Sequence, residues 1–120
     1  MTVWVDDMHK YPMGRFGRMK MSHMMADTDE ELHAMAAKIG VARKWHQHKG
    51  RWSDSHYDIA LSKRALAVAE GAVEITLREM SAYNWHRRAF GFAVDPKVAS
   101  EKMAVAARAS AKSRQEAGHA

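Results

Sequence analysis

The sequence contains no cysteine and has only short apolar runs. Without cysteine the chain forms no disulfide bond and offers no thiolate ligand for zinc, so a cytoplasmic location is expected. A membrane-spanning helix needs about 20 consecutive apolar residues, and the runs here are far shorter. The first residues show no basic stretch followed by an apolar core. We therefore expect neither a signal peptide nor a membrane partner.

Several well-known catalytic motifs are also missing from the sequence. It contains no Walker loop, no dinucleotide-binding glycine pattern, no nucleophile elbow and no HExxH helix. What it has in excess is positive charge, with 19 lysines and arginines against 14 acidic residues and eight histidines in addition. A net charge of +5 favours anionic partners such as nucleotides or nucleic acid.

The order of local patterns predicts an α/β fold with a small parallel or mixed sheet. The expected strands cover residues 3–5, 21–26, 41–45, 57–61 and 72–75, and the expected helices cover residues 28–39, 62–71, 76–90 and 96 onward. Thr28 and Thr76 each precede a glutamate by three residues, which is the capping-box spacing at a helix start. Two strand–helix–strand units result. We expect an α/β domain over residues 1–91 and a C-terminal helical extension over residues 92–120, frayed after about Ser110.

The two central units begin alike, with Ser22-His23 in one and Ser55-His56 in the other. Each continues with a strand, a capped helix and a glycine. Internal duplication explains this similarity, but so does the general recurrence of caps and glycines in such units. The sequence leaves both explanations open.

Several short segments, taken in order, resemble an uncharacterised domain family of phages and actinobacteria. The segments are residues 3–8, 18–23, 26–28, 31–34, 39–40, 43–45, 56–58, 63–64 and 71–73. The resemblance as a whole covers about residues 3–78, and the C-terminal tail lies outside it. The resemblance implies a phage or phage-derived origin, and it implies no particular activity.

Aspartates at expected strand ends form one candidate site. Asp7 follows the first strand and Asp27 the second, and carboxylate ligands there would suit Mg²⁺ or Mn²⁺ and phosphodiester hydrolysis. Such residues also serve as caps, turn formers and ion-pair partners. If the first two strands are antiparallel, Asp6 or Asp7 meets His23. If they are parallel, the acids and histidines lie at opposite edges of the sheet.

A basic loop forms the second candidate site. His46 and His48 lie among residues Arg43, Lys44, Lys49 and Arg51, between Trp45 and Trp52. Cations interleaved with aromatic rings suit a phosphate and a stacked base. The alternative is a solvated loop with Trp45 turned into the core. Nearby, Asp29 and His33 lie one helical turn apart, which suits either acid–base chemistry or a local surface pair.

The segment His56-Tyr57-Asp58 precedes Arg64 at an expected helix start, where free amides attract phosphate. The alternative is capping by Ser62 with an ion pair between Asp58 and Arg64.

Taken together, these patterns favour a protein that binds, and sequesters, a phosphate-bearing small molecule or nucleotide. Its expected binding residues are Arg18, His23, Arg43, His56, Asp58 and Arg64, with Asp7 and Asp27 as metal ligands or orienting groups. A metal-dependent phosphodiesterase or nuclease is the first alternative. A non-catalytic accessory protein that binds a host protein is the second. The C-terminal helices are the expected contact of a homo-oligomer.

Overall fold

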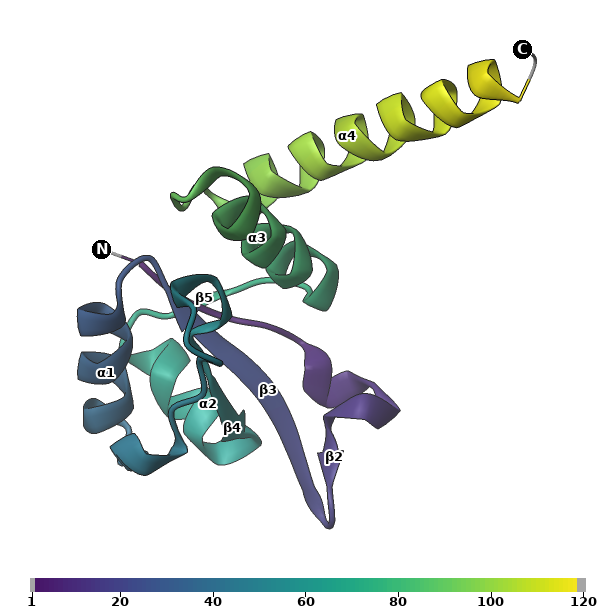
Figure 1. Cartoon of the computed structure of the whole chain (residues 1–120). Coiled ribbons are helices and arrows are strands. Elements are labelled where there is room, and N and C mark those ends of the chain that lie inside the picture. Colours follow the sequence, from purple (N-terminus) through teal and green to yellow (C-terminus); the bar gives the residue numbers. More distant parts are fainter. Residues whose placement is uncertain (1, 119–120) are drawn as a thin grey trace.

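A computed structural model describes residues 2–118, which form a mixed five-stranded sheet with helices on both faces (Figure 1). The strands are β1 (Val3–Val5), β2 (Arg15–Phe16), β3 (Met19–Ala26), β4 (Tyr57–Ala60) and β5 (Val73–Glu74). The helices are α1 (Asp29–Lys38), α2 (Leu61–Ala69), α3 (Leu77–Phe90) and α4 (Pro96–Ala117). Short 3-10 turns are η1 (Met8–Lys10), η2 (Pro12–Gly14), η3 (Arg43–Trp45) and η4 (Trp52–Asp54).

The long strand β3 lies at the centre of the sheet. Strand β1 pairs antiparallel with its C-terminal part, and β4 pairs antiparallel with residues 21–24. The short strand β2 forms a hairpin with the start of β3, and β5 runs parallel to β1. The predicted α/β class, mixed sheet and C-terminal helices are confirmed.

Two expectations about individual elements were wrong. Residues 41–45 form no strand, because Gly40 adopts a left-handed conformation after α1 and the 3-10 turn η3 follows, with Trp45 exposed at 60%. Trp45 is therefore not turned into the core. Helix α4 continues past Ser110 to Ala117, and the last two residues of the expected frayed end lie outside the described residues. Its many alanines, the best helix formers, account for this length.

The two faces of the sheet carry separate apolar clusters. Val5, Met24 and Tyr57 pack in the cluster that also contains side chains of α1 and α2, whereas Trp4 and Met25 pack with α3. Neighbouring strand residues point to opposite faces. His23 and Asp58 adjoin Met24 and Tyr57 along the chain, so both lie on the face covered by α3.

Side-chain caps start α1, α3 and α4, whereas α2 begins at Leu61 after Ala60 without a side-chain cap, so the alternative of capping by Ser62 was wrong. Thr76 and Glu79 form a complete capping box at α3. Thr28 accepts a hydrogen bond from the Glu31 amide at α1, and Asp95 accepts one from the Lys97 amide ahead of α4. Each cap satisfies a backbone donor that the first turn of a helix leaves free.

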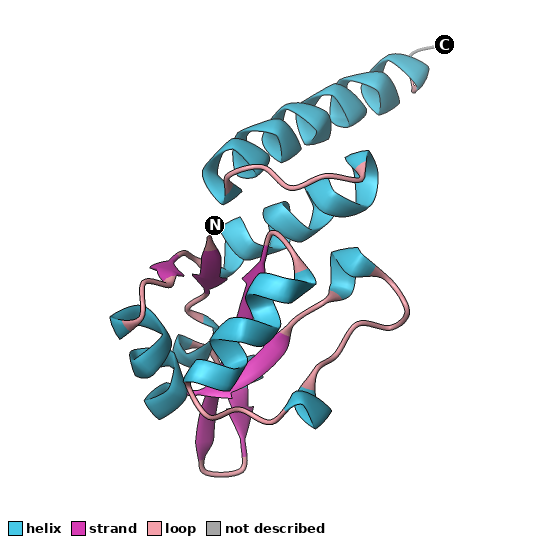
Figure 2. Ribbon diagram, turned by 90° about the vertical axis from the view of Figure 1, so that its left-hand side faces the viewer, coloured by secondary structure: helices cyan, strands magenta, loops and turns pink. Residues whose placement is uncertain are grey.

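Helix α4 packs against α3 at its start, where Ala99 is fully buried, and then extends away from the sheet (Figures 1 and 2). Residues 104–118 are exposed. The expected homo-oligomer through this helix stays a prediction. Over the described residues, no helix is both long enough and apolar enough to span a bilayer.

Candidate metal centre

The pairing of three strands brings Asp6, His23 and Asp58 together. Asp6 follows β1 directly, and the antiparallel pairing of β1 with β3 places its carboxylate Oδ2 2.6 Å from Nδ1 of His23. His23 in turn lies directly opposite Asp58 in the pairing of β3 with β4. Of the two arrangements that the sequence allowed, the antiparallel one is realised.

Asp6 is a fully buried carboxylate with three hydrogen-bond donors. Its Oδ1 accepts from the backbone amides of Met8 and His23, at 3.1 and 3.0 Å, and its Oδ2 accepts from the His23 ring. Burial lowers the pKa of His23, but the hydrogen bond that its ring donates to Asp6 and the charges of Asp6 and Asp58 raise it more, so the net shift is upward from the usual value of 6.5. Asp6 therefore fixes the ring with Nδ1 as donor and Nε2 directed away from it.

His56 is oriented in a similar way by a backbone carbonyl. Its Nδ1 donates to the carbonyl oxygen of Asp54 at 2.6 Å, which leaves Nε2 free. The rings of His23 and His56 lie edge to face with centroids 5.4 Å apart. Both free Nε2 atoms approach the same oxygen, Oδ1 of Asp58, at 3.8 Å from His23 and 3.6 Å from His56.

Oδ1 of Asp58 has no hydrogen-bond partner. Its Oδ2 accepts from the Gln47 side chain at 2.9 Å, whereas its Oδ1 is buried and has no hydrogen bond. Separations of 3.6 and 3.8 Å are too long for hydrogen bonds. Two ligands of one tetrahedral ion, each about 2.0–2.1 Å from it, lie about 3.3 Å apart. Small side-chain movements would therefore place one metal ion among His23, His56 and Asp58.

This cluster of His23, His56 and Asp58 is the candidate metal centre. Within residues 2–118, these are the three side chains whose ligand atoms lie within 4.8 Å of one another. Both histidines are held through their other nitrogen, as is usual for metal-ligating imidazoles. With neutral imidazoles, Asp6 and Asp58 carry two negative charges, which a divalent ion would balance.

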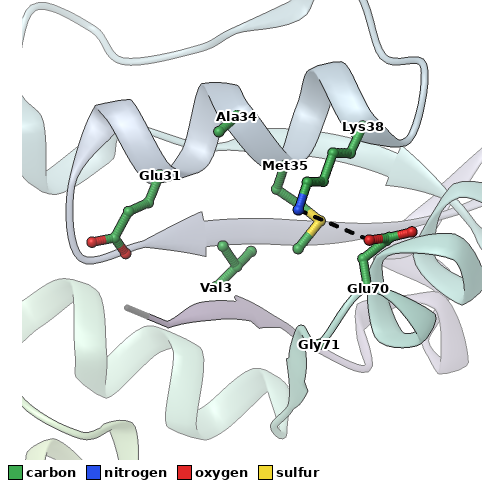
Figure 3. A pocket seen from close by; sticks show the side chains of 7 residues that line it. All are labelled: Val3, Glu31, Ala34, Met35, Lys38, Glu70 and Gly71. Carbon is green, nitrogen blue, oxygen red and sulfur yellow. Dashed lines mark ion pairs between the residues drawn. The ribbon is translucent and has the colours of Figure 1, made fainter.

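Two hollows give access to the centre. One cleft of about 450 Å³ contains both histidines and is lined further by Met13, Met25, Lys49, Asp54, Leu77, Met80, Ser81 and Asn84. A larger groove of about 610 Å³ reaches Asp58 and is mostly apolar, with Arg15 and Lys63 among its lining residues. A third hollow of about 180 Å³, between α1 and the turn after α2, is lined by Glu31 and by the Lys38–Glu70 ion pair, and the three-ligand group of the described residues lies elsewhere (Figure 3).

The two aspartates expected to bind metal lie elsewhere and support the packing of α3. Asp7 Oδ1 accepts from the backbone amide of Leu77, the first residue of α3, at 2.7 Å. Asp27 Oδ1 accepts from the Tyr83 hydroxyl at 2.6 Å and from the Trp4 indole at 3.3 Å. Neither belongs to the cluster with His23.

The expected arginines do not join the cluster either. Arg64 donates to the Asp6 carbonyl oxygen at 2.8 Å and to Glu74 at 2.7 Å, so the expected pairing of Arg64 with Asp58 was wrong. Arg18 is exposed in the turn between β2 and β3. Arg43 lines a separate cavity with His33. Of the six predicted binding residues, the structure brings together the two histidines and Asp58.

Two supporting groups were not foreseen in the sequence analysis. The carbonyl oxygen of Asp54 and the side chain of Gln47 reach the centre because residues 47 and 56 form an isolated antiparallel bridge. A bridge of one residue pair leaves no periodic pattern. The alternation of polar and apolar residues at 56–59, in contrast, is a signal from which a shared face of His56 and Asp58 could have been predicted.

Replacing Asp6 by asparagine is expected to weaken metal binding about 10- to 100-fold, because supporting partners of ligating histidines have effects of this size. Competition with a chromophoric chelator measures the change. Asp95→Asn is the matched control, since asparagine caps a helix equally well. Equal affinities of Asp6→Asn and the unsubstituted protein would contradict the assigned role of Asp6.

Asp6→Asn is also expected to remove a pH dependence from the free energy of unfolding of the metal-free protein. The raised pKa of His23 means that its pairing with Asp6 stabilises the fold fully below pH 6.5. This contribution is lost as the pH rises through the pKa of the folded state.

The comparisons with known proteins give one result. The family model described as "Protein of unknown function (DUF4031)" matches residues 3–89, which include all three residues of the centre. No curated protein and no solved structure matches the chain significantly.

Proposed function

We propose a function for this chain, which belongs to the DUF4031 family of proteins of unknown function, from the geometry of its own residues. It binds one divalent metal ion through His23, His56 and Asp58, and it uses that ion to hydrolyse a phosphate ester. The observation that carries the proposal is the unpartnered Asp58 Oδ1 facing two imidazole nitrogens whose rings are already fixed.

The donor set favours Zn²⁺ or Mn²⁺ over Mg²⁺. Mg²⁺ prefers oxygen ligands and retains most of its water, whereas two imidazoles and one carboxylate form a typical ligand set of catalytic zinc sites. The sequence pointed to Mg²⁺ or Mn²⁺ because aspartates, with at most one histidine, were the expected ligands. Two histidines change that preference.

Three protein ligands leave at least one coordination position open for water or substrate. A metal ion lowers the pKa of bound water to about 7 and so supplies hydroxide near neutral pH. The cleft beside the histidines contributes Lys49 as a cation and Asn84 as a polar group, both suited to phosphate oxygens. Together with the net charge of +5, this supports an anionic substrate.

Hydrolysis of bis(p-nitrophenyl) phosphate tests this function directly. We expect EDTA-treated protein to be inactive, to regain activity with Zn²⁺ or Mn²⁺, and to lose it in His56→Ala. His9→Ala is the matched control, because His9 hydrogen-bonds Ser22 outside the cluster. Metal binding without turnover of this diester or of p-nitrophenyl phosphate would overturn the hydrolase assignment, and failure to bind metal would overturn the centre itself.

A further inference from the structure

A second polar cavity lies on the opposite face of β4 from the metal centre. Its volume is about 420 Å³, and it is lined by Asp29, His33, Arg43, His46, His48, Gly50, Arg51 and Trp52. We call it the histidine cavity. Tyr57 supports it from the α1 side of the sheet, whereas the neighbouring His56 and Asp58 point to the α3 side. The two sites therefore use different side chains.

Buried hydroxyl groups orient two of the three histidines. Nδ1 of His33 lies 2.7 Å from the hydroxyl of Tyr57, and Nε2 of His46 lies 2.8 Å from Oγ of Ser55. Tyr57 and Ser55 are 0% and 1% exposed, so the hydroxyl groups are held in the interior, whereas the two histidines that they contact are partly exposed. The rings of His33 and His46 meet edge to face at 4.5 Å, and His46 stacks on His48 at 5.0 Å.

The hydrogen bonds determine what His46 and His48 present to the cavity. The Ser55 hydroxyl donates to Asp29 Oδ1 at 2.5 Å, so its oxygen accepts from Nε2 of His46. A neutral His46 then offers Nδ1 as an acceptor. Nδ1 of His48 accepts from the Gly50 amide at 3.0 Å, and its Nε2 is therefore a donor.

The pKa values of the histidines and the charges of the nearby arginines determine which chemical groups the cavity can bind. Burial lowers the pKa of both His33 and His46, and the charge of Arg43 adds to this effect at His33, whereas the neighbouring His33 adds to it at His46, which favours the neutral form of both rings. In the described part of the chain, the guanidinium of Arg43 has no hydrogen bond or ion pair, whereas that of Arg51 binds Asp54 through Nε. The Asp29 carboxylate also lines the cavity, and it accepts the Ser55 hydroxyl.

We propose that the histidine cavity binds the phosphate group of a small ligand that also carries a hydroxyl donor. Arg43 and Nε2 of His48 donate to the phosphate oxygens, and the hydroxyl donates to Nδ1 of His46. The cavity is larger than one phosphate ion and contains the Trp52 ring, which suits a nucleoside monophosphate. Inorganic hydrogen phosphate presents the same chemistry. The site is no metal centre, because the three-ligand group of the described residues lies at His23 instead.

Calorimetric titration of EDTA-treated protein with AMP and with inorganic phosphate tests the site. EDTA removes metal, so phosphate held by a metal ion does not contribute. We expect Arg43→Ala to weaken binding at least about tenfold, the usual effect of one charge-assisted hydrogen bond. Lys44→Ala is the matched control, because it removes the same charge from the next residue, which does not line the cavity.

Each outcome decides between alternatives. Loss of affinity in Arg43→Ala but not in Lys44→Ala supports the site. The probe that binds more tightly, AMP or inorganic phosphate, then shows whether the phosphate group comes from a nucleotide or from the free ion. Equal loss in both variants would indicate general charge attraction and overturn the proposal. Sulfate carries no hydroxyl, so sulfate binding as tight as phosphate binding would overturn the role of His46. Failure of both probes to bind would refute the site and leave the metal centre untouched.

Discussion

Asp58→Asn and His56→Ala are expected to abolish stoichiometric Zn²⁺ binding. Each removes one of three ligands, and the loss must exceed the 10- to 100-fold effect of removing a supporting residue. Asp58→Asn is the more informative variant because it keeps the size of the side chain and can keep the Gln47 contact. Calorimetry on EDTA-treated protein measures both the affinity and the stoichiometry.

Thermal unfolding provides a second measurement of the same prediction. A ligand present at 100 times its dissociation constant stabilises the folded state by about 2.7 kcal/mol. We expect Zn²⁺ to raise the unfolding temperature of the unsubstituted protein and of Glu30→Gln, a carboxylate control exposed on α1. Neither ligand variant should respond. A full response in Asp58→Asn would show that the ion binds elsewhere.

The sequence could predict the components of the metal centre better than their assembly. Alternate residues of a strand point to the same face, so the sequence is enough to place His56 and Asp58 on one face. The position of Asp6 directly after β1 is likewise enough to place it at the end of that strand. The partner of Asp6 depended on the direction of β3 relative to β1, which local patterns do not determine. Hydrogen bonding to α3 similarly decided the roles of Asp7 and Asp27, and only tertiary packing reveals it.

The basic loop also shows how far its structure could be predicted from the sequence. Its composition predicted a polar surface that includes Arg43, His46 and His48, and these residues do line one cavity. The expected strand at residues 41–45 was wrong, because its apolar residues Val41, Ala42 and Trp45 do not alternate with polar ones as in a half-buried strand. Trp45 and Trp52 look equivalent in sequence, yet only Trp52 lines the histidine cavity.

Arg87 joins α3 to the sheet and is 1% exposed. Its Nη1 donates to the Ala26 carbonyl oxygen and its Nη2 to that of Ser53, both at 3.0 Å. The guanidinium also lies 4.7 Å from the Trp52 ring centroid and 4.9 Å from that of Tyr83. Burial lowers its pKa, which reflects the cost of keeping the charge inside.

Arg87→Met is expected to lower the free energy of unfolding by about 2–4 kcal/mol, which urea denaturation measures. Methionine fills most of the space but leaves the carbonyl oxygens of Ala26 and Ser53 buried without donors. Removing the buried charge offsets part of this loss, because desolvating a cation is itself unfavourable. Arg88→Met, on the exposed side of α3, is the matched control and should change stability by less than about 0.5 kcal/mol. If Arg87→Met is as stable as the unsubstituted protein, apolar packing alone joins α3 to the sheet.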